Sequence, residues 1–188
     1  MLAYHGTAVR GLQTLTPFAN PHSNLKYPCV YPSTNEALAS IYIWSRPYKW
    51  MTFEIHNDMP VYNESFEGCL KEFYSGVSGC IYQCDGDFET DENTTIKHAV
   101  ISKSPVAIKS ADLISDAYEH ILRSEAEGKL IINHFATRSD EQRQRDRNMV
   151  LGAIKRLDLL RGEHILSAFV AEKFPHLWDE AKSLAEAQ

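Results

Sequence analysis

Residues 2–7 read Leu-Ala-Tyr-His-Gly-Thr, residues 28–33 read Pro-Cys-Val-Tyr-Pro-Ser, and these two stretches decide which fold the sequence indicates. Each is a short apolar and aromatic run that a turn residue ends, which is typical of a β-strand. A Gly-Thr pair ends the first run. Pro32 ends the second, because proline cannot donate a hydrogen bond to a central sheet ladder. We therefore expect two strands that carry His5 and Tyr31 near their ends.

The residues that follow the second strand predict a helix. Residues 33–36 read Ser-Thr-Asn-Glu, a capping-box pattern in which Ser33 begins a helix and Glu36 reaches back to it. Apolar residues then recur at helical spacing, so we expect a helix over residues 34–44. Other runs in the first half predict further elements. We expect strands within 11–17 and at 52–55, 80–84, 99–102 and 106–108, and a short helix at 63–74.

The spacing of apolar residues changes in the second half. From residue 111 onward they recur about every 3.6 positions, so we expect a helix that ends before Gly128, a residue suited to left-handed backbone. Residues 130–132 predict a short strand. Residues 139–142 read Ser-Asp-Glu-Gln, which is a second capping box. We expect it to begin a helix that runs to about Arg161, followed by helices over 163–174 and 176–187.

Composition also separates the two halves of this 188-residue chain. Residues 1–100 contain 6 Lys and Arg, 11 Asp and Glu and 15 of the 20 aromatic residues. Residues 101–188 contain 13 Lys and Arg, 14 Asp and Glu and few aromatic residues. The length favours one domain with a small appendage. We expect an α+β domain over residues 1–135 and an α-helical C-terminal extension over residues 136–188.

The charge and the absent motifs exclude several common functions. A formal net charge of −6 disfavours a protein that coats nucleic acid, because phosphate binding needs a basic surface. The sequence lacks a phosphate-binding loop and the Gly-x-Ser-x-Gly, His-Glu-x-x-His and Gly-x-Gly-x-x-Gly patterns. It also lacks a signal-peptide pattern and an apolar run long enough to span a membrane, so we expect a cytoplasmic protein without membrane contact. The four cysteines lack zinc-site spacing, so we expect reduced thiols and no metal.

The His-Gly-Thr sequence at residues 5–7, together with a strand that ends in Tyr31 just before a helix, resembles the opening of the ADP-ribosyltransferase fold family. This family includes the poly(ADP-ribose) polymerases and small bacterial transferases. The resemblance covers residues 2–45 and extends more thinly over residues 76–108. It implies a split β-sheet core, NAD as the substrate, and transfer of ADP-ribose with release of nicotinamide.

The resemblance also implies roles for individual residues. His5 matches the histidine that hydrogen-bonds the ribose next to adenine, and an imidazole can donate or accept such a bond. Gly6 matches the glycine that lets the backbone approach the nicotinamide amide, with Thr7 beside it. Tyr31 matches the tyrosine that stacks on the nicotinamide ring, and Tyr42 matches a second aromatic residue of some members. The residues alone leave open a hydrogen-bonded core histidine at position 5 and an ordinary strand aromatic at position 31.

The family commonly places a carboxylate near the ribose, where it stabilises the positive charge that develops at the anomeric carbon. If the equivalent strand begins near Ile96, the position falls at residues 97–99, Lys-His-Ala, of which none is acidic. If the acid comes instead from the loop at 85–92, that loop offers 5 acidic residues in 8 positions. The candidates are Asp87, Glu89 and Asp91. The alternative interpretation of this loop is a solvated acidic turn.

Two functions from different classes follow from these patterns. The first is NAD-dependent ADP-ribosyl transfer to a protein or nucleic-acid acceptor that the sequence does not identify. The second is a non-catalytic module of the same fold that binds a nucleotide or ADP-ribose, or serves as a protein interface, and the missing acid at 97–99 favours it. A third function, removal of an RNA 2′-phosphate, would need arginines in the cleft, and the first hundred residues contain only Arg10 and Arg46.

The basic residues of the helical extension have two interpretations. They resemble a nucleic-acid patch, but acidic residues are interleaved with them, which is typical of a solvated helix face. The basic residues are Arg143, Arg145, Arg147, Lys155, Arg156 and Arg161. We expect the extension to act as a lid, as a homodimer surface or as the binding site of another protein.

Overall fold

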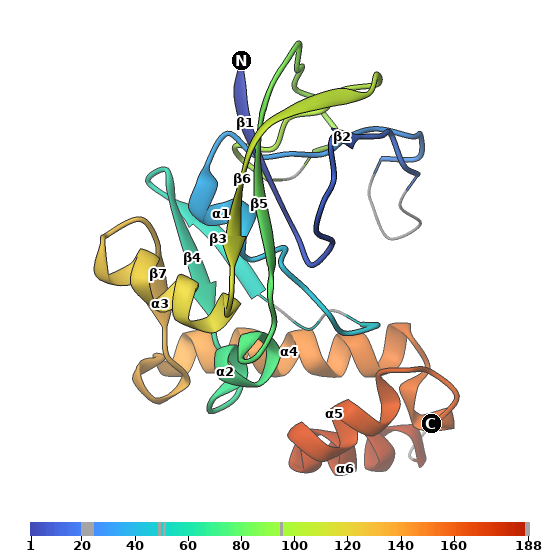
Figure 1. The fold of residues 1–188 in the computed structure, drawn as a ribbon. Coiled ribbons are helices and arrows are strands. Elements are labelled where there is room, and N and C mark those ends of the chain that lie inside the picture. Colours follow the sequence, from blue (N-terminus) through green and yellow to red (C-terminus); the bar gives the residue numbers. More distant parts are fainter. Residues whose placement is uncertain (20–24, 49, 51, 95, 187–188) are drawn as a thin grey trace.

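Figure 1 shows the computed structural model, which describes residues 1–19, 25–48, 50, 52–94 and 96–186 of a mixed α+β protein. The strands are β1 (Leu2–Thr7), β2 (Thr14–Leu15), β3 (Thr52–His56), β4 (Met59–Asn63), β5 (Gly79–Asp85), β6 (Val106–Ile114) and β7 (Ile131–Asn133). The α-helices are α1 (Glu36–Ser40), α2 (Cys69–Tyr74), α3 (Ala117–Ala126), α4 (Asp140–Arg156), α5 (Ser167–Lys173) and α6 (Pro175–Glu186). Short 3₁₀ turns cover Phe135–Thr137 and Leu159–Arg161.

The larger sheet is antiparallel and has the strand order β1-β5-β6-β2. Beyond β1, two irregular segments continue it. Ser33 pairs with Tyr4 of β1 on one side and with Ala99 on the other, and Val30 pairs with Ser102. Residues 30–33 therefore lie between β1 and residues 99–102. The sheet thus brings together two segments that are separated in the sequence by about a third of the chain.

Residues 12–18 cross from one edge of this arrangement to the other. Leu15 of β2 pairs with Val106 of β6, and three residues later Phe18 pairs with Cys29. Because this short segment pairs at both ends, the sheet curls into an open ring rather than lying flat. The space inside the curl is the place where a pocket can form.

A second sheet has the order β3-β4-β7. The β3–β4 hairpin turns at Asn57 and Asp58, which both have positive φ, and these residue types tolerate that conformation better than most. Strand β7 pairs with β4 in parallel, with Val61 opposite Ile131. The chain leaves β7 through a 3₁₀ turn and enters α4, the long orange helix that runs below the sheets in Figure 1.

Several sequence predictions are confirmed. Strands occur at the predicted positions 52–55, 80–84, 106–108 and 130–132, and β2 lies within 11–17. The Ser139 capping box is present, since the Ser139 hydroxyl accepts from the Gln142 N–H and the Gln142 side chain accepts from the Ser139 N–H. Gly128 has the expected left-handed backbone after α3.

The helix predicted over 34–44 is wrong in its start and its length. Helix α1 spans only Glu36–Ser40, and its cap is Asn35, whose Oδ1 accepts from the Leu38 N–H at 2.9 Å. Ser33 does not cap the helix, because its backbone is paired with β1 and its hydroxyl accepts from the Asn35 N–H. Pairing in the sheet overrides the local capping signal at this position.

Several further element predictions need correction. The apolar run from residue 111 begins as strand, because β6 continues to Ile114 by pairing with β5, and α3 starts only at Ala117. The helix predicted at 63–74 is shorter, since β4 runs to Asn63 and α2 begins at Cys69. The strand predicted to carry Tyr31 and the strand predicted at 99–102 exist only as isolated bridges. The helical stretches after residue 139 are found, but α4 ends at Arg156 and α5 is limited to Ser167–Lys173.

The main hydrophobic core contains residues of both halves of the sequence. Leu38 and Phe73 from the first half are buried in the same cluster as Val150, Phe169 and Leu177 from the helices. The Phe169 ring lies 5.7 Å from the Phe73 ring, centroid to centroid. The C-terminal helices are therefore packed on the sheet-bearing half through a shared core, while a separate unit over 136–188 stays a prediction.

Within the described part of the chain, no helix has both the length and the apolar character needed to cross a bilayer.

Candidate ligand-binding site

A pocket of about 540 Å³ lies inside the curl of the larger sheet. Its walls come from β1, from residues 12–18 and 25–33, from the end of α1 and the residues just after it, and from residues 96–99. The five predicted ligand-binding residues all line this one pocket. They are His5, Gly6, Thr7, Tyr31 and Tyr42. The residues predicted from the sequence resemblance thus converge in space, although their assignment to NAD stays a prediction.

The lining of the pocket is aromatic, aliphatic and hydroxyl-bearing. Tyr4, Tyr27 and Phe18 add to the two predicted tyrosines, and Thr14, Thr16 and Ser33 add hydroxyl groups. No Asp, Glu, Lys or Arg is among the described residues that line the pocket. Such a lining suits a flat ring that carries hydrogen-bonding groups rather than a ligand held by ion pairs.

His5 connects the two stretches on which the sequence analysis rests. It lies on β1 opposite Tyr82 of β5, and its imidazole is hydrogen-bonded to the backbone of Tyr31. Burial lowers the pKa of His5 below its ordinary value of 6.5, and the Tyr31 hydrogen bond only partly opposes this shift. At neutral pH the ring is therefore uncharged. The contact fixes the orientation of the imidazole at the pocket wall.

Gly6 is required by packing as well as by its place in the lining. A Cβ atom on Gly6 would come within 1.9 Å of the carbonyl oxygen of Ala39 in α1, which is far closer than any real contact. Strand β1 and helix α1 can approach this closely only because Gly6 has no side chain. The close approach brings Tyr42, just beyond α1, to the pocket that β1 lines.

The two predicted tyrosines are held firmly. Tyr42 packs against Phe53 of β3 edge to face, with ring centroids 6.2 Å apart. Burial raises the pKa of Tyr42 well above its usual value, and burial also raises that of Tyr31. Both rings therefore stay neutral over the physiological range. They offer aromatic surface to a ligand without adding charge to the pocket.

The three acidic candidates do not line the pocket. Asp87 is exposed. Glu89 forms an ion pair with Lys103 at 2.7 Å, and its backbone pairs with Ile101. Asp91 comes nearest, because its Oδ2 accepts a hydrogen bond from the hydroxyl of Tyr27, a residue that does line the pocket.

The other segment considered for the acid, residues 96–99, also contributes to the pocket wall. Ala99 and Ile96 line it, because Ala99 pairs with Ser33, two residues after Tyr31. Between them, His98 has a φ of 70° and its Nδ1 lies 3.3 Å from the Thr34 hydroxyl. The described wall contributed by this segment is therefore apolar, and of residues 97–99, one of the two places considered for the acid, only Ala99 lines the pocket.

Tyr27 is a site residue that the sequence analysis missed. Its ring packs with Tyr31 around the small cluster of Leu25, Cys29 and Ile101. A tyrosine before a proline in a loop gives no local signal for a role. Its partner Asp91 lies 64 residues away, so the contact cannot be recognised from spacing along the chain.

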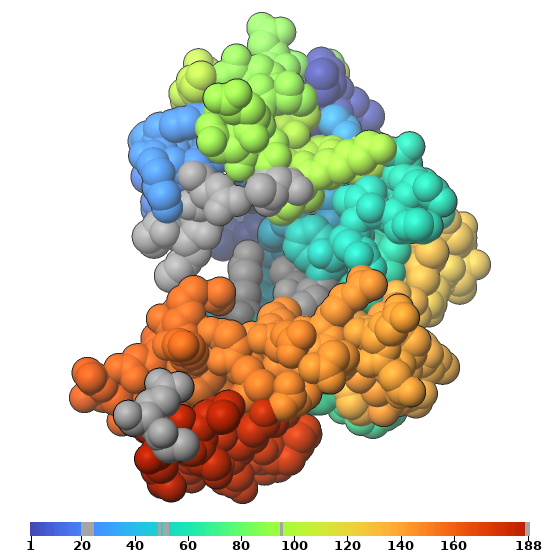
Figure 2. All heavy atoms as spheres, turned by 180° about the vertical axis from the view of Figure 1, so that it is seen from behind, coloured from blue at the N-terminus to red at the C-terminus, as the bar shows by residue number. Residues whose placement is uncertain are grey.

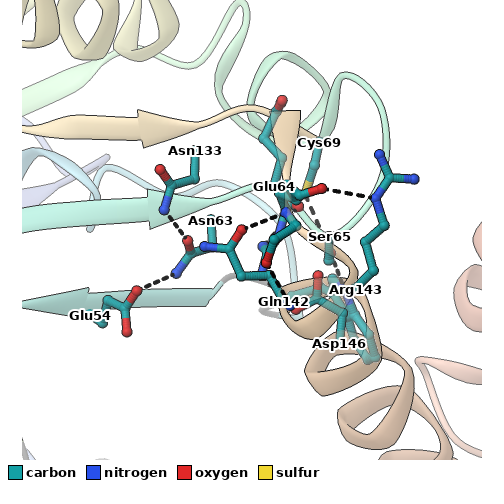
Figure 3. A network of polar contacts seen from close by, with 12 residues as sticks. Glu54, Asn63, Glu64, Ser65, Cys69, Asn133, Gln142, Arg143 and Asp146 are labelled. Atoms are coloured by element: carbon teal, nitrogen blue, oxygen red, sulfur yellow. Dashed lines mark hydrogen bonds and ion pairs between the residues drawn. The ribbon is translucent and has the colours of Figure 1, made fainter. Parts of the chain in front are cut away.

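A separate polar network joins β4 and β7 to α4, as Figure 3 shows. The buried carboxylate of Glu64 accepts from the Leu70 and Phe135 N–H groups and lies 3.2 Å from His134 Nδ1. Arg138, also buried, donates to the Glu64 carbonyl oxygen and to Asp146 Oδ1, each at 3.1 Å. These contacts lie within the fold and fasten the helical half to the second sheet.

Two of the basic residues on α4 are also engaged within the protein. Arg143 donates to the carbonyl oxygens of Arg138 and Phe135 and lies over the Phe135 ring at 5.0 Å. Arg147 forms an ion pair with Glu180 of α6. These two arginines therefore contribute to packing at the start of α4 and between α4 and α6.

Comparison with protein-family models, with curated proteins and with solved structures finds no match for this chain. No group of three or more His, Cys, Asp or Glu side chains placed to hold a metal ion occurs among the described residues.

Proposed function

We propose that the protein binds NAD in the pocket of the curled sheet and transfers ADP-ribose to an acceptor, with release of nicotinamide. The observation that carries this proposal is the convergence of His5, Tyr31 and Tyr42 on one pocket from three separate segments. Tyr31 and Tyr42 would hold the nicotinamide ring between aromatic faces. The neutral imidazole of His5 would bind a ribose hydroxyl.

The chemical step is substitution at the anomeric carbon of the nicotinamide ribose. The bond from this carbon to the nicotinamide nitrogen breaks, and its electron pair neutralises the positive charge of the pyridinium ring. The acceptor nucleophile forms the new bond to the carbon and loses its proton to solvent. Positive charge develops on the ribose in the transition state, so a nearby carboxylate would lower the barrier. Asp91 is the acid of the 85–92 loop best connected to the pocket, through Tyr27.

The test is release of nicotinamide from NAD by the wild type and by His5→Ala and Tyr31→Ala. We expect release to fall at least about tenfold in each variant, because each loses a ligand contact worth about 1.4 kcal/mol or more. Tyr118→Phe on α3, outside the pocket, is the control. Circular dichroism and thermal melting establish that the variants are folded. Normal turnover in both pocket variants contradicts the proposal.

A second function, ligand binding without catalysis, is favoured by one specific observation. The described lining has no carboxylate, and Ala99 is the one lining residue among 97–99, where the resemblance would place the acid if this segment is the equivalent strand. A module of this kind would bind NAD or ADP-ribose and leave both intact. Calorimetry paired with the release assay separates the two functions, since binding without turnover identifies the module.

The proposal assigns NAD as a substrate and needs no metal. We propose a protein or nucleic acid as the acceptor and the cytoplasm as the compartment. For the helical extension we propose contact with a partner protein or with a second copy of the chain. The third sequence-based function, removal of an RNA 2′-phosphate, gains no support, because the described pocket residues include no arginine.

A further inference from the structure

The hydroxyl of Tyr27 is committed to a single partner. It donates its proton to Oδ2 of Asp91, and Oδ1 of Asp91 accepts from the backbone and side-chain N–H groups of Asn93 at 2.8 and 2.9 Å. Asp91 is therefore fixed on both oxygens by neighbours within the protein. A tyrosine hydroxyl has only one proton, so the Tyr27 oxygen offers other groups nothing but its lone pairs.

The charges around this pair keep the proton on Tyr27. The hydrogen bond to Asp91 raises the pKa of Tyr27 to about 12, and the same bond lowers the pKa of Asp91. Lys103 lies 5.4 Å above the Tyr27 ring but forms its ion pair with Glu89. Near neutral pH the pair is thus a phenol bound to a carboxylate, which makes the phenol oxygen a stronger acceptor than a free tyrosine.

The rest of the lining supplies no compensating positive charge. Because no Lys or Arg is among the described residues that line the pocket, a phosphate entering it would meet the Asp91 carboxylate behind Tyr27, and the nearby Lys103 is already paired with Glu89. A hydroxyl or amide N–H of a ligand would instead find a polarised acceptor. Repulsion of a phosphate and acceptance from a hydroxyl or amide N–H both favour an uncharged group of the ligand in the pocket.

We propose that the Tyr27–Asp91 pair determines the specificity of the pocket: its oxygen accepts from a hydroxyl or amide donor of the ligand, and its charge excludes anionic groups. The part of the ligand inside the pocket is therefore a phosphate-free nucleoside end, with a flat ring and a free ribose, and any phosphate lies outside. This inference rests on the proposed function for the identity of the ligand, and it adds the residues that select which part enters.

The experiment compares two ligands that differ in one phosphate. Affinities of nicotinamide riboside and of its 5′-phosphate are measured by calorimetry for the wild type, Tyr27→Phe and Asp91→Asn. We expect the wild type to gain nothing from the phosphate. We expect Tyr27→Phe to weaken the riboside by about tenfold, the loss for one charge-assisted hydrogen bond.

Asp91→Asn gives the readout that a merely structural role would not produce. Removing the negative charge should weaken the riboside and strengthen its 5′-phosphate, so that the ratio of the two affinities changes by about fivefold or more. Glu92→Gln is the matched control, because it removes the same charge from the same exposed loop without touching Tyr27. It should leave both affinities within about twofold.

Equal losses for both ligands in Asp91→Asn, no loss of riboside affinity in Tyr27→Phe, or a wild type that prefers the phosphate by tenfold overturns the inference. The outcomes also separate it from the proposed function. Riboside binding with the expected selectivity but no nicotinamide release from NAD overturns the transfer and leaves the inference standing. Normal release by the wild type with an unchanged Tyr27→Phe variant overturns the inference alone. A wild type that binds neither NAD nor the riboside overturns both.

Discussion

The curled sheet and the helical half of this chain differ in where their ionisable side chains are placed. The pocket of the curled sheet contains no charged side chain among its described lining residues, and its histidine is kept neutral by burial. At the junction with the helical half, by contrast, Glu64, Arg138 and Asp146 are charged groups buried inside the protein. A neutral lining leaves room for a ligand, whereas a buried network whose groups bind one another holds segments together. We therefore propose ligand binding in the first region, while the second region docks the helices.

The largest expected effect on stability comes from removing the buried arginine. Arg138→Met leaves Asp146 buried without its partner and removes the bond to the Glu64 carbonyl oxygen, so we expect a loss of about 3–5 kcal/mol in the free energy of unfolding. Urea denaturation measures it. Arg145→Ala, an exposed position on the same helix, should change stability by less than about 0.5 kcal/mol.

The double variant Arg138→Met, Asp146→Leu tests whether the loss of stability comes from leaving Asp146 without its partner. Replacing both partners removes the unpaired charge, so the double variant should be more stable than Arg138→Met alone. Similar stability of Arg138→Met and the wild type would show that the pair does not fasten the helices.

Alanine substitutions at two glycines, Gly6 and Gly152, compare how tightly the two regions are packed. Gly6→Ala places a Cβ against the Ala39 carbonyl oxygen, and separating β1 from α1 should cost about 1–3 kcal/mol and weaken ligand binding. Gly152→Ala in the exposed middle of α4 meets nothing within 4 Å and should stabilise the protein by about 0.5–1 kcal/mol. Thermal unfolding of the two variants measures both effects. Equal changes in stability would contradict the close packing of β1 on α1.

The smallest effect is a dependence of stability on pH. Since the pKa of His5 is lowered in the folded protein, the unfolded chain binds more protons as the pH falls below about 6.5. Stability should therefore decrease as the pH is lowered through this window, and His5→Gln should decrease less steeply. His120, whose pKa is also lowered by burial, leaves part of the slope in place. Denaturation at pH 7 and pH 5.5 provides the measurement, and identical slopes would show that His5 is not buried as described.

Sequence patterns predicted elements best where local signals agreed with the sheet pairing. The Ser139 capping box and the strands β1 and β5 are such cases. The apolar run at Leu113 and Ile114 fits either a helix or a strand, and only its pairing with β5 decides for a strand. The capping signal at Ser33 was overridden in the same way.

The candidate site could be predicted as far as its residues lie in short, recognisable stretches. His5 and Tyr31 were found because each lies in a short stretch with a recognisable pattern, and their convergence follows from the pairing of Tyr4 with Ser33. Tyr27 and Asp91 were not predicted as a pair, because a contact between two loop residues 64 positions apart has no local pattern. The acidic loop had a compositional signal, but composition does not say which carboxylate faces inward.

The most direct test of the central claim is a titration of the ¹⁵N-labelled protein with NAD, followed by backbone amide chemical shifts. We expect the shifts to change at β1, at residues 25–33 and at residues 96–99, and to stay unchanged along α4 and α6. Tyr31→Ala should show the same free spectrum away from the pocket and much smaller changes on adding NAD. No change in the wild type at millimolar NAD, or changes centred on the helical half, would contradict a NAD-binding pocket in the curled sheet.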